Sequence, residues 1–246
     1  MPAAPTGEVT LVFTDVQGST ALWDRAPEAM REALALHDAL MRQTLADEHG
    51  YEVKTEGDAF MVAFHSPTEA VSWCLTVQQA LLDARWPPTI TEHQEAKEQR
   101  DEQGKLLFAG LRVRMGAHTG QPICQPDPNT GRMDYFGGMV NRAARVGGAG
   151  HGGQIIISAS TWEQLSGRVG DAVVDDLGEH ALKGLKRHEH LRQVLPSALA
   201  GRQFQRLKTP SLKNTNLGKE TDKFFGRKQE LDELAQRVFK GERLIT

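Results

Sequence analysis

Apolar residues along the chain fall into segments with two kinds of spacing, one typical of strands and one of helices. Residues 8–16, EVTLVFTDV, form a nearly continuous apolar run, which is typical of a strand buried on both faces of a sheet. Residues 51–64 alternate as two strands, and Gly57 and Asp58 form a plausible turn between them. Residues 107–120 alternate in the same way, so these segments predict a sheet.

Helical spacing dominates the segments between these strands. Residues 19–49 keep apolar side chains on one helical face, and Pro27 predicts that a short helix ends before a longer one begins. Ser19 and Thr20 are candidate caps for the short helix. Residues 66–86 predict a further amphipathic helix with a proline in its first turn.

The second half of the chain continues the mixture of strands and helices. Residues 89–105 are polar and charged, which predicts a solvated arm on the surface. Residues 121–137 are rich in turn formers and predict a flap, and residues 138–150 predict a short helix. A strand, a helix and a closing strand pair are expected over residues 151–195, so the whole pattern favours an α/β sandwich with a mixed sheet.

The apolar periodicity weakens after this closing strand pair. We therefore expect one domain over residues 1–195 and a linker over residues 196–222. Residues 223–246 then show a helix pattern followed by the start of a strand.

Composition narrows the class of protein. The 246 residues are 39% hydrophobic and 25% charged with a net charge of −3, which is ordinary for a globular protein and argues against a nucleic-acid partner. Cys74 and Cys124 show no disulfide-like or metal-like spacing, which favours a reducing compartment. No apolar run reaches the length of a membrane span and no signal peptide is recognisable, so we expect no membrane contact and a cytoplasmic location.

Two acidic residues stand where strands of the predicted sheet end. Asp15 ends the first strand and Asp58 lies in the predicted hairpin turn. Two carboxylates that converge at one sheet edge repel each other unless a cation lies between them, and oxygen ligands suit Mg²⁺ or Mn²⁺. Two independently solvated acids remain an alternative at this point.

Two helix starts carry candidate phosphate chemistry. Residues 17–20, QGST, follow Asp15 and open the first helix, where free backbone N–H groups favour an anion, although an ordinary helix cap fits the same letters. Asn141 and Arg145 lie four residues apart on the short helix, so an amide and a guanidinium share one face there. The sequence contains no P-loop and no dinucleotide-binding glycine pattern.

Taken together, these stretches resemble the catalytic domain of the class III nucleotidyl cyclases over residues 7–195, and most closely the fungal-type adenylate cyclases. The resemblance rests on three motifs in the family's order: VTLVFTDVQGST, YEVKTEGDAFM and MDYFGGMVNRAARV. It implies an α/β (α+β) fold with a ferredoxin-like, palm-type mixed sheet and flanking helices.

The resemblance also implies a role for each matching residue. Two Mg²⁺ or Mn²⁺ ions would be held by Asp15, Asp58 and the carbonyl of Val16, and the phosphates would be bound by Gly18, Ser19, Thr20 and Lys183. Lys54 and Asp134 would recognise the base. Asn141 would bind the ribose, and Arg145 would stabilise the reacting α-phosphate.

The two base-reading residues predict the substrate. Lys54 only donates hydrogen bonds and an ionised Asp134 only accepts them, which complements the N1 acceptor and N6 donor of adenine. Guanylate cyclases of the family typically place Glu and Cys at these positions. We therefore expect ATP as the substrate, with 3′,5′-cyclic AMP and pyrophosphate as products.

The resemblance further implies a homodimer with two shared sites. In this family one subunit supplies the metal ligands and the other supplies the base-reading residues, so Asp58 would serve its own metals while Lys54 reaches into the partner's site. All these positions occur in this one chain, so two copies would complete two sites and a monomer would be inactive.

Three alternatives to an adenylate cyclase remain open from the sequence. They are a catalytically silent nucleotide-sensing module of the same fold, a guanylate cyclase, and a diguanylate cyclase, which would need a GGDEF-type hairpin where this chain reads TEGDAF. Residues 223–246 resemble the start of a signal-transduction ATPase domain, which predicts a regulatory C-terminal domain.

Overall fold

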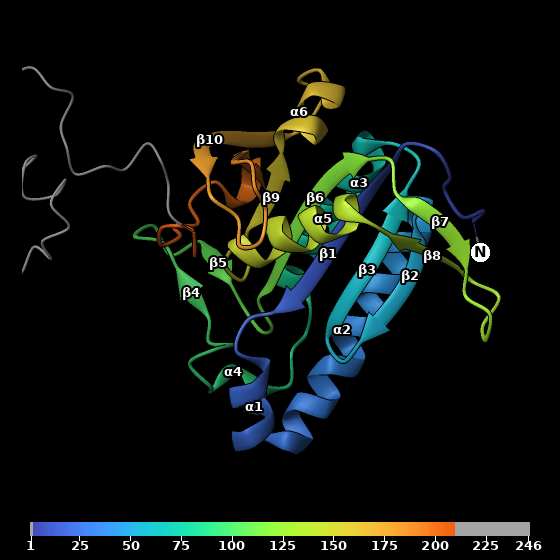
Figure 1. The fold of residues 1–246 in the computed structure, drawn as a ribbon. Helices are drawn as coiled ribbons and strands as arrows, with labels where there is room; N and C mark the ends of the chain where they lie inside the picture. Colours follow the sequence, from blue (N-terminus) through green and yellow to red (C-terminus); the bar gives the residue numbers. More distant parts are fainter. Residues whose placement is uncertain (1, 210–246) are drawn as a thin grey trace, which may run out of the picture. The chain divides into compact units, whose positions relative to one another are not determined.

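A seven-stranded sheet forms the centre of the computed structural model, which describes residues 2–209 (Figure 1). The strand order is β10-β11-β9-β6-β1-β3-β2, and all neighbours are antiparallel except β6 and β9. The strands are β1 (Val9–Val16), β2 (Tyr51–Glu56), β3 (Ala59–Phe64), β6 (Val113–Gly120), β9 (Ile155–Ser158), β10 (Ala172–His180) and β11 (Glu189–Pro196). The predicted mixed sheet with flanking helices is confirmed.

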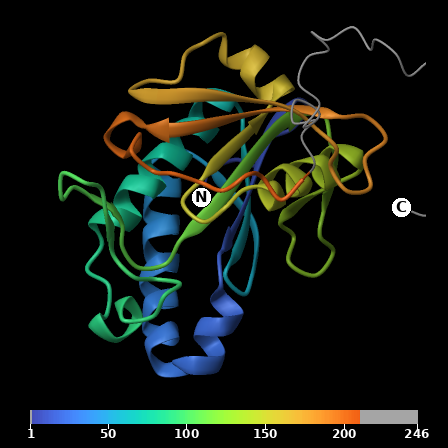
Figure 2. The same cartoon turned by 90° about the vertical axis from the view of Figure 1, so that its left-hand side faces the viewer.

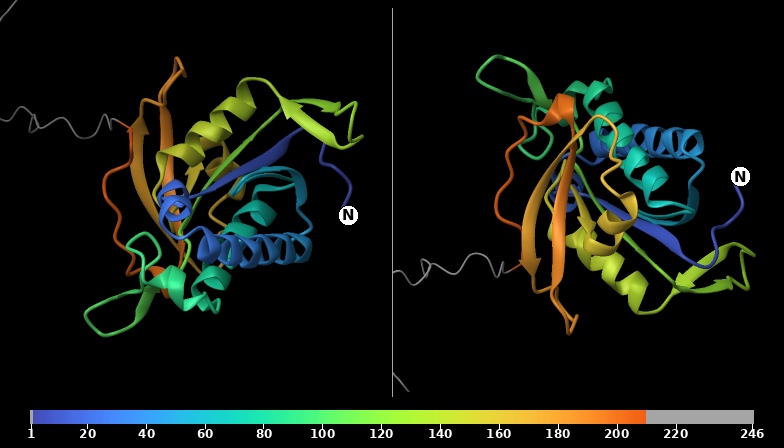
Figure 3. Two further views of the ribbon diagram at one scale, coloured as in Figure 1. Left: turned by 90° about the horizontal axis from the view of Figure 1, so that it is seen from below. Right: turned by 90° about the horizontal axis from the view of Figure 1, so that it is seen from above.

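Helices cover both faces of this sheet. On one face lie α2 (Pro27–Asp47), α3 (Pro67–Asp83) and α6 (Ala159–Leu165), and on the other lies α5 (Gly138–Ala149), as Figure 3 shows for α2, α3 and α5. Alternate residues of β1 enter the two cores: Val12 packs with Trp73 of α3, whereas Leu11 packs with Tyr135 on the other side. All four side chains are at most 1% exposed, which explains the continuous apolar run of this strand.

The first two helices divide where the proline predicted it. The helix α1 (Ser19–Arg25) ends one residue before Ala26, and Pro27 opens α2, where its missing N–H costs no hydrogen bond. The predicted caps of α1 are wrong. Gly18 is the N-cap residue, with φ 77°, and no side chain caps the helix, because Ser19 and Thr20 already lie in its first turn.

Two excursions leave the sheet. The predicted flap is a hairpin of β7 (Ile123–Pro126) and β8 (Met133–Phe136). The expected arm holds α4 (Pro88–Thr91) and β4 (Gln99–Arg100), and β4 pairs with β5 (Leu106–Phe108). This segment is only partly solvated, contrary to the prediction, because Ile90 and Ala96 are fully buried in the main core.

The predicted strand over residues 107–120 is also interrupted. It divides into β5 and β6 around Gly110, which has φ 68° and lies against the ring of Trp86. A side chain at this position would overlap that ring, so the glycine fixes the break between the two strands.

The segment after the last strand packs against the domain. A short 3₁₀ helix, η1 (Ser197–Leu199), is followed by residues 200–209, which we call the C-terminal strap. Leu199 is 1% exposed and Arg202 is 5% exposed, so this part of the expected linker packs on the domain.

The domain boundary itself stays a prediction, and residues 210–246, with the expected ATPase-like segment, lie outside the described residues. No helix among residues 2–209 is both long and apolar enough to cross a membrane.

Candidate active site

The end of β1 brings the two predicted metal-binding acids together. Asp15 is the last but one residue of β1, and Asp58 lies in the turn between β2 and β3. Because β3 pairs antiparallel with β1, the hairpin turn comes to the end of β1, where the backbone N–H of Val16 donates to Asp58 Oδ2 at 3.3 Å. The predicted convergence of these carboxylates is therefore present in the fold.

Burial and neighbouring charges shift the pKa of Asp15. Burial raises the pKa of Asp15, and the neighbouring negative charge of Asp58 raises it further, while Arg114 opposes both. Arg114 lies opposite Asp15 in the register of β6 with β1, and its guanidinium donates to Asp15 Oδ2. A partly buried carboxylate with a second carboxylate beside it forms a donor set that a hard cation stabilises.

The two acids can supply only part of the coordination of a metal ion. Among residues 2–209, no three or more His, Cys, Asp or Glu side chains gather closely enough to enclose a metal ion. Asp15, Asp58 and the carbonyl of Val16 therefore fit an open site for Mg²⁺ or Mn²⁺, in which water and phosphate oxygens complete the coordination.

The predicted phosphate turn, residues 17–20, is held by hydrogen bonds from two sides. Gln17 N donates to the Arg112 carbonyl at 2.9 Å, and Gln17 Oε1 accepts from Gly152 N at 2.9 Å. A Cβ on Gly18 would lie 2.8 Å from the Cγ of Glu95, so the turn has no room for a larger residue. Together with its positive φ angle, this contact explains why a glycine follows the strand.

The predicted base-reading residues meet within one chain. Lys54 Nζ of β2 donates to Asp134 Oδ2 of β8 at 3.0 Å, and their side chains are 42% and 18% exposed. Asp134 Oδ1 also accepts from Tyr135 N at 2.8 Å, which fixes the orientation of the carboxylate. The expectation that Lys54 serves a partner's site stays a prediction.

The predicted ribose and transition-state residues lie on the outer face of α5. Asn141 and Arg145 are exposed one turn apart, while Ala143 and Val146 between and beside them are fully buried. In the part of the chain that the structure describes, no hydrogen bond or ion pair joins either exposed side chain to Asp15 or Asp58. The described part of one chain therefore presents these two halves of the predicted site without a hydrogen bond or ion pair between them.

Lys183 is placed by a different loop. It is exposed in the connection between β10 and β11, directly after Leu182, which is 3% exposed and packs with Val146 and Ala149 of α5. The buried leucine fixes the base of this loop on the same helix that carries Asn141.

Arg114 is a candidate residue that reasoning from the sequence missed. Its only signal is a charged residue within an alternating strand, and its position beside Asp15 depends on the pairing of β6 with β1, which separates the two residues by 99 positions. The pairing register is a property of the folded sheet, so no local pattern reveals it.

Comparisons with known proteins agree with this architecture. A family model described as "Adenylate and Guanylate cyclase catalytic domain" matches residues 1–195. An adenylate cyclase of Mycosarcoma maydis is 42% identical over 81% of this chain, and one of Lachancea kluyveri is 43% identical over 81%. The chain spans only 10% and 13% of these two relatives' lengths, respectively.

Solved structures show the same fold. Adenylate cyclases of Trypanosoma brucei, described in their monomeric state, superpose with a TM-score of 0.74 at 34% identity, covering 84% of this chain and 96% of theirs. The adenylyl cyclase CyaB of P. aeruginosa superposes with a TM-score of 0.60 at 26% identity, covering 76% of this chain and 93% of its own. Because the family model matches residues 1–195, most of its length, this chain belongs to the adenylate and guanylate cyclase catalytic domain family.

Proposed function

We propose that this domain is an adenylate cyclase that converts ATP to 3′,5′-cyclic AMP and pyrophosphate at two sites shared between two copies of the chain. The observation that carries this proposal is the ion pair between Lys54 and Asp134. An ammonium group can only donate and a carboxylate can only accept, so the pair matches the acceptor and donor on the edge of adenine. Guanine presents the reverse order at these positions and would leave both groups mismatched.

The phosphates of ATP fit the opposite end of the site. We assign the turn of Gly18, Ser19 and Thr20 to the phosphates, together with the guanidinium of Arg114 and the ammonium of Lys183. Metal ions held by Asp15, Asp58 and the Val16 carbonyl would supply positive charge that lowers the pKa of the ribose 3′-hydroxyl and stabilises the leaving pyrophosphate.

In the proposed reaction the ribose 3′-oxygen attacks the α-phosphorus of the same ATP. The new O3′–P bond forms as the bond from the α-phosphorus to the β-phosphate bridging oxygen breaks, and the hydroxyl proton passes to a base, for which water, a substrate phosphate and Asp15 are the candidates. Asn141 orients the ribose for this attack, and Arg145 stabilises the charge that builds at the α-phosphate.

The separation within one chain supports a shared site. Asn141 and Arg145 point outward from α5, while the paired acids lie at the end of β1. A second copy related by twofold symmetry can present its α5 to the acids of the first, and symmetry then creates two equivalent sites. The two free cysteines, Cys74 and Cys124, are compatible with the cytoplasmic location that an ATP-dependent enzyme of this kind would have.

Product analysis of the purified chain tests this proposal. The chain is incubated with ATP or with GTP, in Mg²⁺ and then in Mn²⁺, over a wide range of protein concentrations. We expect cyclic AMP from ATP, with a specific activity that rises as the chain dimerises. Cyclic GMP from GTP in preference to cyclic AMP from ATP would assign a guanylate cyclase, and a dimer that binds ATP but releases no cyclic product would assign a silent nucleotide-sensing module.

A further inference from the structure

The C-terminal strap is fastened to the domain at its beginning. Arg202 Nε donates to the Leu107 carbonyl at 2.8 Å, and its Nη1 donates to the Gly153 carbonyl at 2.9 Å and to Gln78 Oε1 at 2.6 Å. The same guanidinium lies 4.5 Å from the centre of the Phe108 ring. With 5% exposure and three acceptors, Arg202 fixes the strap much as a core residue would.

The C-terminal strap is also held on the domain by hydrogen bonds around Lys208. Figure 2 shows the last described residues running across the domain toward α5. Three hydrogen bonds hold this end: His151 Nε2 to the Arg206 carbonyl at 3.0 Å, Lys208 N to the Ala149 carbonyl at 3.1 Å, and Thr209 Oγ1 with His180 Nδ1 at 3.0 Å. Leu207 packs on the cluster formed by the end of α5. The backbone of Lys208 is therefore fixed on both sides.

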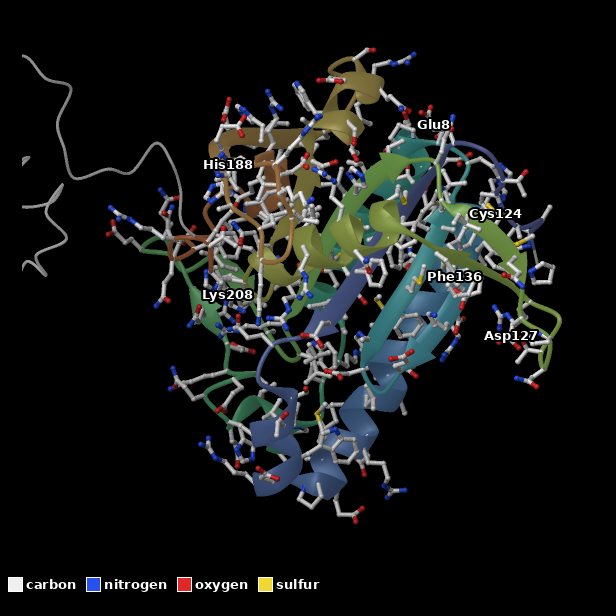
Figure 4. All side chains as sticks on the ribbon, in the orientation of Figure 1. Glu8, Cys124, Asp127, Phe136, His188 and Lys208 are labelled. Atoms are coloured by element: carbon white, nitrogen blue, oxygen red, sulfur yellow. The ribbon has the colours of Figure 1, made fainter. Side chains whose placement is uncertain are left out.

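These contacts bring the backbone of Lys208 to the loop that holds the phosphate turn. The loop that accepts from Lys208 N at Ala149 continues to Gly152, whose N–H donates to Gln17 Oε1 in the turn after Asp15. Figure 4 labels Lys208 on the side of the molecule where β1 ends. Partial burial and the positive charge of Arg114 lower the pKa of Lys208, and the negative charge of Asp15 opposes this. The ammonium group therefore interacts with both Arg114 and Asp15.

The ammonium group of Lys208 is available for a ligand. Among residues 2–209 it forms no ion pair within 4.0 Å, whereas Arg114 is already committed to Asp15. A lysine is a flexible point charge, so its ammonium group can approach the terminal phosphates of a nucleotide in addition to Arg114 and Lys183.

We propose that Lys208 is a further substrate-binding residue, which the C-terminal strap carries to the terminal phosphates of the nucleotide bound at Asp15, Asp58 and the phosphate turn of the same chain. This inference rests on one part of the proposed function, the binding of a nucleoside triphosphate at this site, and not on its cyclisation. It also makes the strap part of the catalytic unit, so that a chain ending at the last strand would lack one phosphate ligand.

A different role for Lys208 predicts the opposite result. If its ammonium group acted only as a counter-ion for Asp15, it would compete with the metal ions, and its removal would strengthen metal and pyrophosphate binding. The two roles are therefore separated by the sign of the change in affinity.

The test compares Lys208→Met with Lys105→Met, a matched change at an exposed lysine in the connection between β4 and β5. Both are made in the 246-residue chain, and Lys208→Arg serves as the conservative rescue. Calorimetry measures the binding of Mn²⁺ and pyrophosphate, and kinetics measure the KM for ATP. Melting temperatures confirm that each variant folds, which is expected because both side chains are exposed.

We expect Lys208→Met to bind pyrophosphate about tenfold more weakly and to raise the KM for ATP by a similar factor, while Lys105→Met matches the unmodified chain and Lys208→Arg stays within about threefold of it. Unchanged or tighter pyrophosphate binding in Lys208→Met would overturn the inference, as would an unmodified chain that binds no pyrophosphate. Because calorimetry needs no turnover, a chain that makes no cyclic AMP but loses pyrophosphate affinity in Lys208→Met would refute the proposed function and leave this inference standing.

Discussion

Asp134 Oδ2 accepts a hydrogen bond from Lys54 Nζ at 3.0 Å, so the two residues predicted to read the base are in contact within a single chain. The β7–β8 hairpin that carries Asp134 is fixed on β2 by further contacts, including Met133 N to the Tyr51 hydroxyl at 2.9 Å and Arg132 to the Glu52 carbonyl. An entering base must therefore exchange this ion pair for its own hydrogen bonds, which makes the fit of donors and acceptors decisive for base choice.

Substitution of Lys54 and Asp134 should change which nucleotide the chain prefers. Replacing Lys54 by Glu and Asp134 by Cys places an acceptor where adenine needs a donor, so the ratio of kcat/KM for ATP to that for GTP should fall by on the order of 100-fold or more. Steady-state kinetics with both nucleotides measure this ratio. Arg25→Gln, an exposed change on α1, serves as the control, and an unchanged preference in the double variant would show that other residues read the base.

The fold was largely predictable from the sequence because its signals are local. The strand run before Asp15, the division at Pro27 and the hairpin turn at Asp58 all depend on residues close together in the chain. The resemblance supplied the order of the motifs, which local periodicity cannot provide. The convergence of the two acids then followed from the antiparallel pairing of neighbouring strands.

What the sequence could not predict depends on contacts between distant segments. Arg114 reaches Asp15 only through the register of two strands, and Arg202 is buried only because the strap folds back onto β5. A charged residue in a polar stretch predicts exposure, and only tertiary contacts reverse that expectation. The caps of α1 were wrong for a similar reason, since the conformation of Gly18 places the helix start one residue earlier.

A close contact between two glycines predicts that the position of α5 matters for activity. A Cβ on Gly116 of β6 would lie 2.2 Å from the backbone of Gly147, whereas Gly148 has open space around it. We expect Gly116→Ala to displace α5 with its Asn141 and Arg145, lowering kcat about tenfold or more and the free energy of unfolding by about 1–3 kcal/mol.

Gly148→Ala is the matched control for this helix. It should keep full activity and raise the free energy of unfolding by about 0.5–1 kcal/mol, since alanine loses less backbone entropy in a helix. Denaturant unfolding and steady-state assays measure both variants. Full activity of Gly116→Ala would contradict the idea that the close packing of α5 positions these side chains.

The buried arginine of the strap predicts a stability difference between two similar substitutions. Burial and the charge of Arg112 lower the pKa of Arg202 to about 10, but the group is still charged at neutral pH and its three acceptors depend on it. Arg202→Met should lower the free energy of unfolding by about 2–3 kcal/mol. Arg206→Met, at an exposed side chain, should change it by less than about 0.5 kcal/mol. Equal effects in thermal or denaturant unfolding would contradict the anchoring role of Arg202.

The raised pKa of Asp15 predicts a pH-dependent response to metal. Between its ordinary value of 3.8 and its raised pKa in the fold, the folded chain binds more protons than the unfolded chain, so the contribution of Asp15 to stability falls as pH rises through this window. At neutral pH the carboxylate is ionised and disfavoured by burial, and a bound cation relieves this cost.

We therefore expect Mn²⁺ to raise the melting temperature at pH 7 by a few degrees, and this increase should diminish as pH falls into the window where Asp15 takes up its proton. Asp15→Asn should lose the increase, while Asp24→Asn, at an exposed residue of α1, should keep it. Thermal melts with and without metal measure the effect. A metal response that survives in Asp15→Asn would place the ions elsewhere.

The shared site is tested most directly by mixing two inactive variants, Asp15→Ala and Arg145→Ala. Each homodimer lacks a required residue in both sites, so each variant alone should be inactive with ATP. When equal amounts exchange subunits freely, half of the dimers are mixed and each has one intact site, so the mixture should regain about a quarter of the unmodified activity. A mixture that stays inactive, although differently tagged subunits are shown to associate, would contradict the shared-site account.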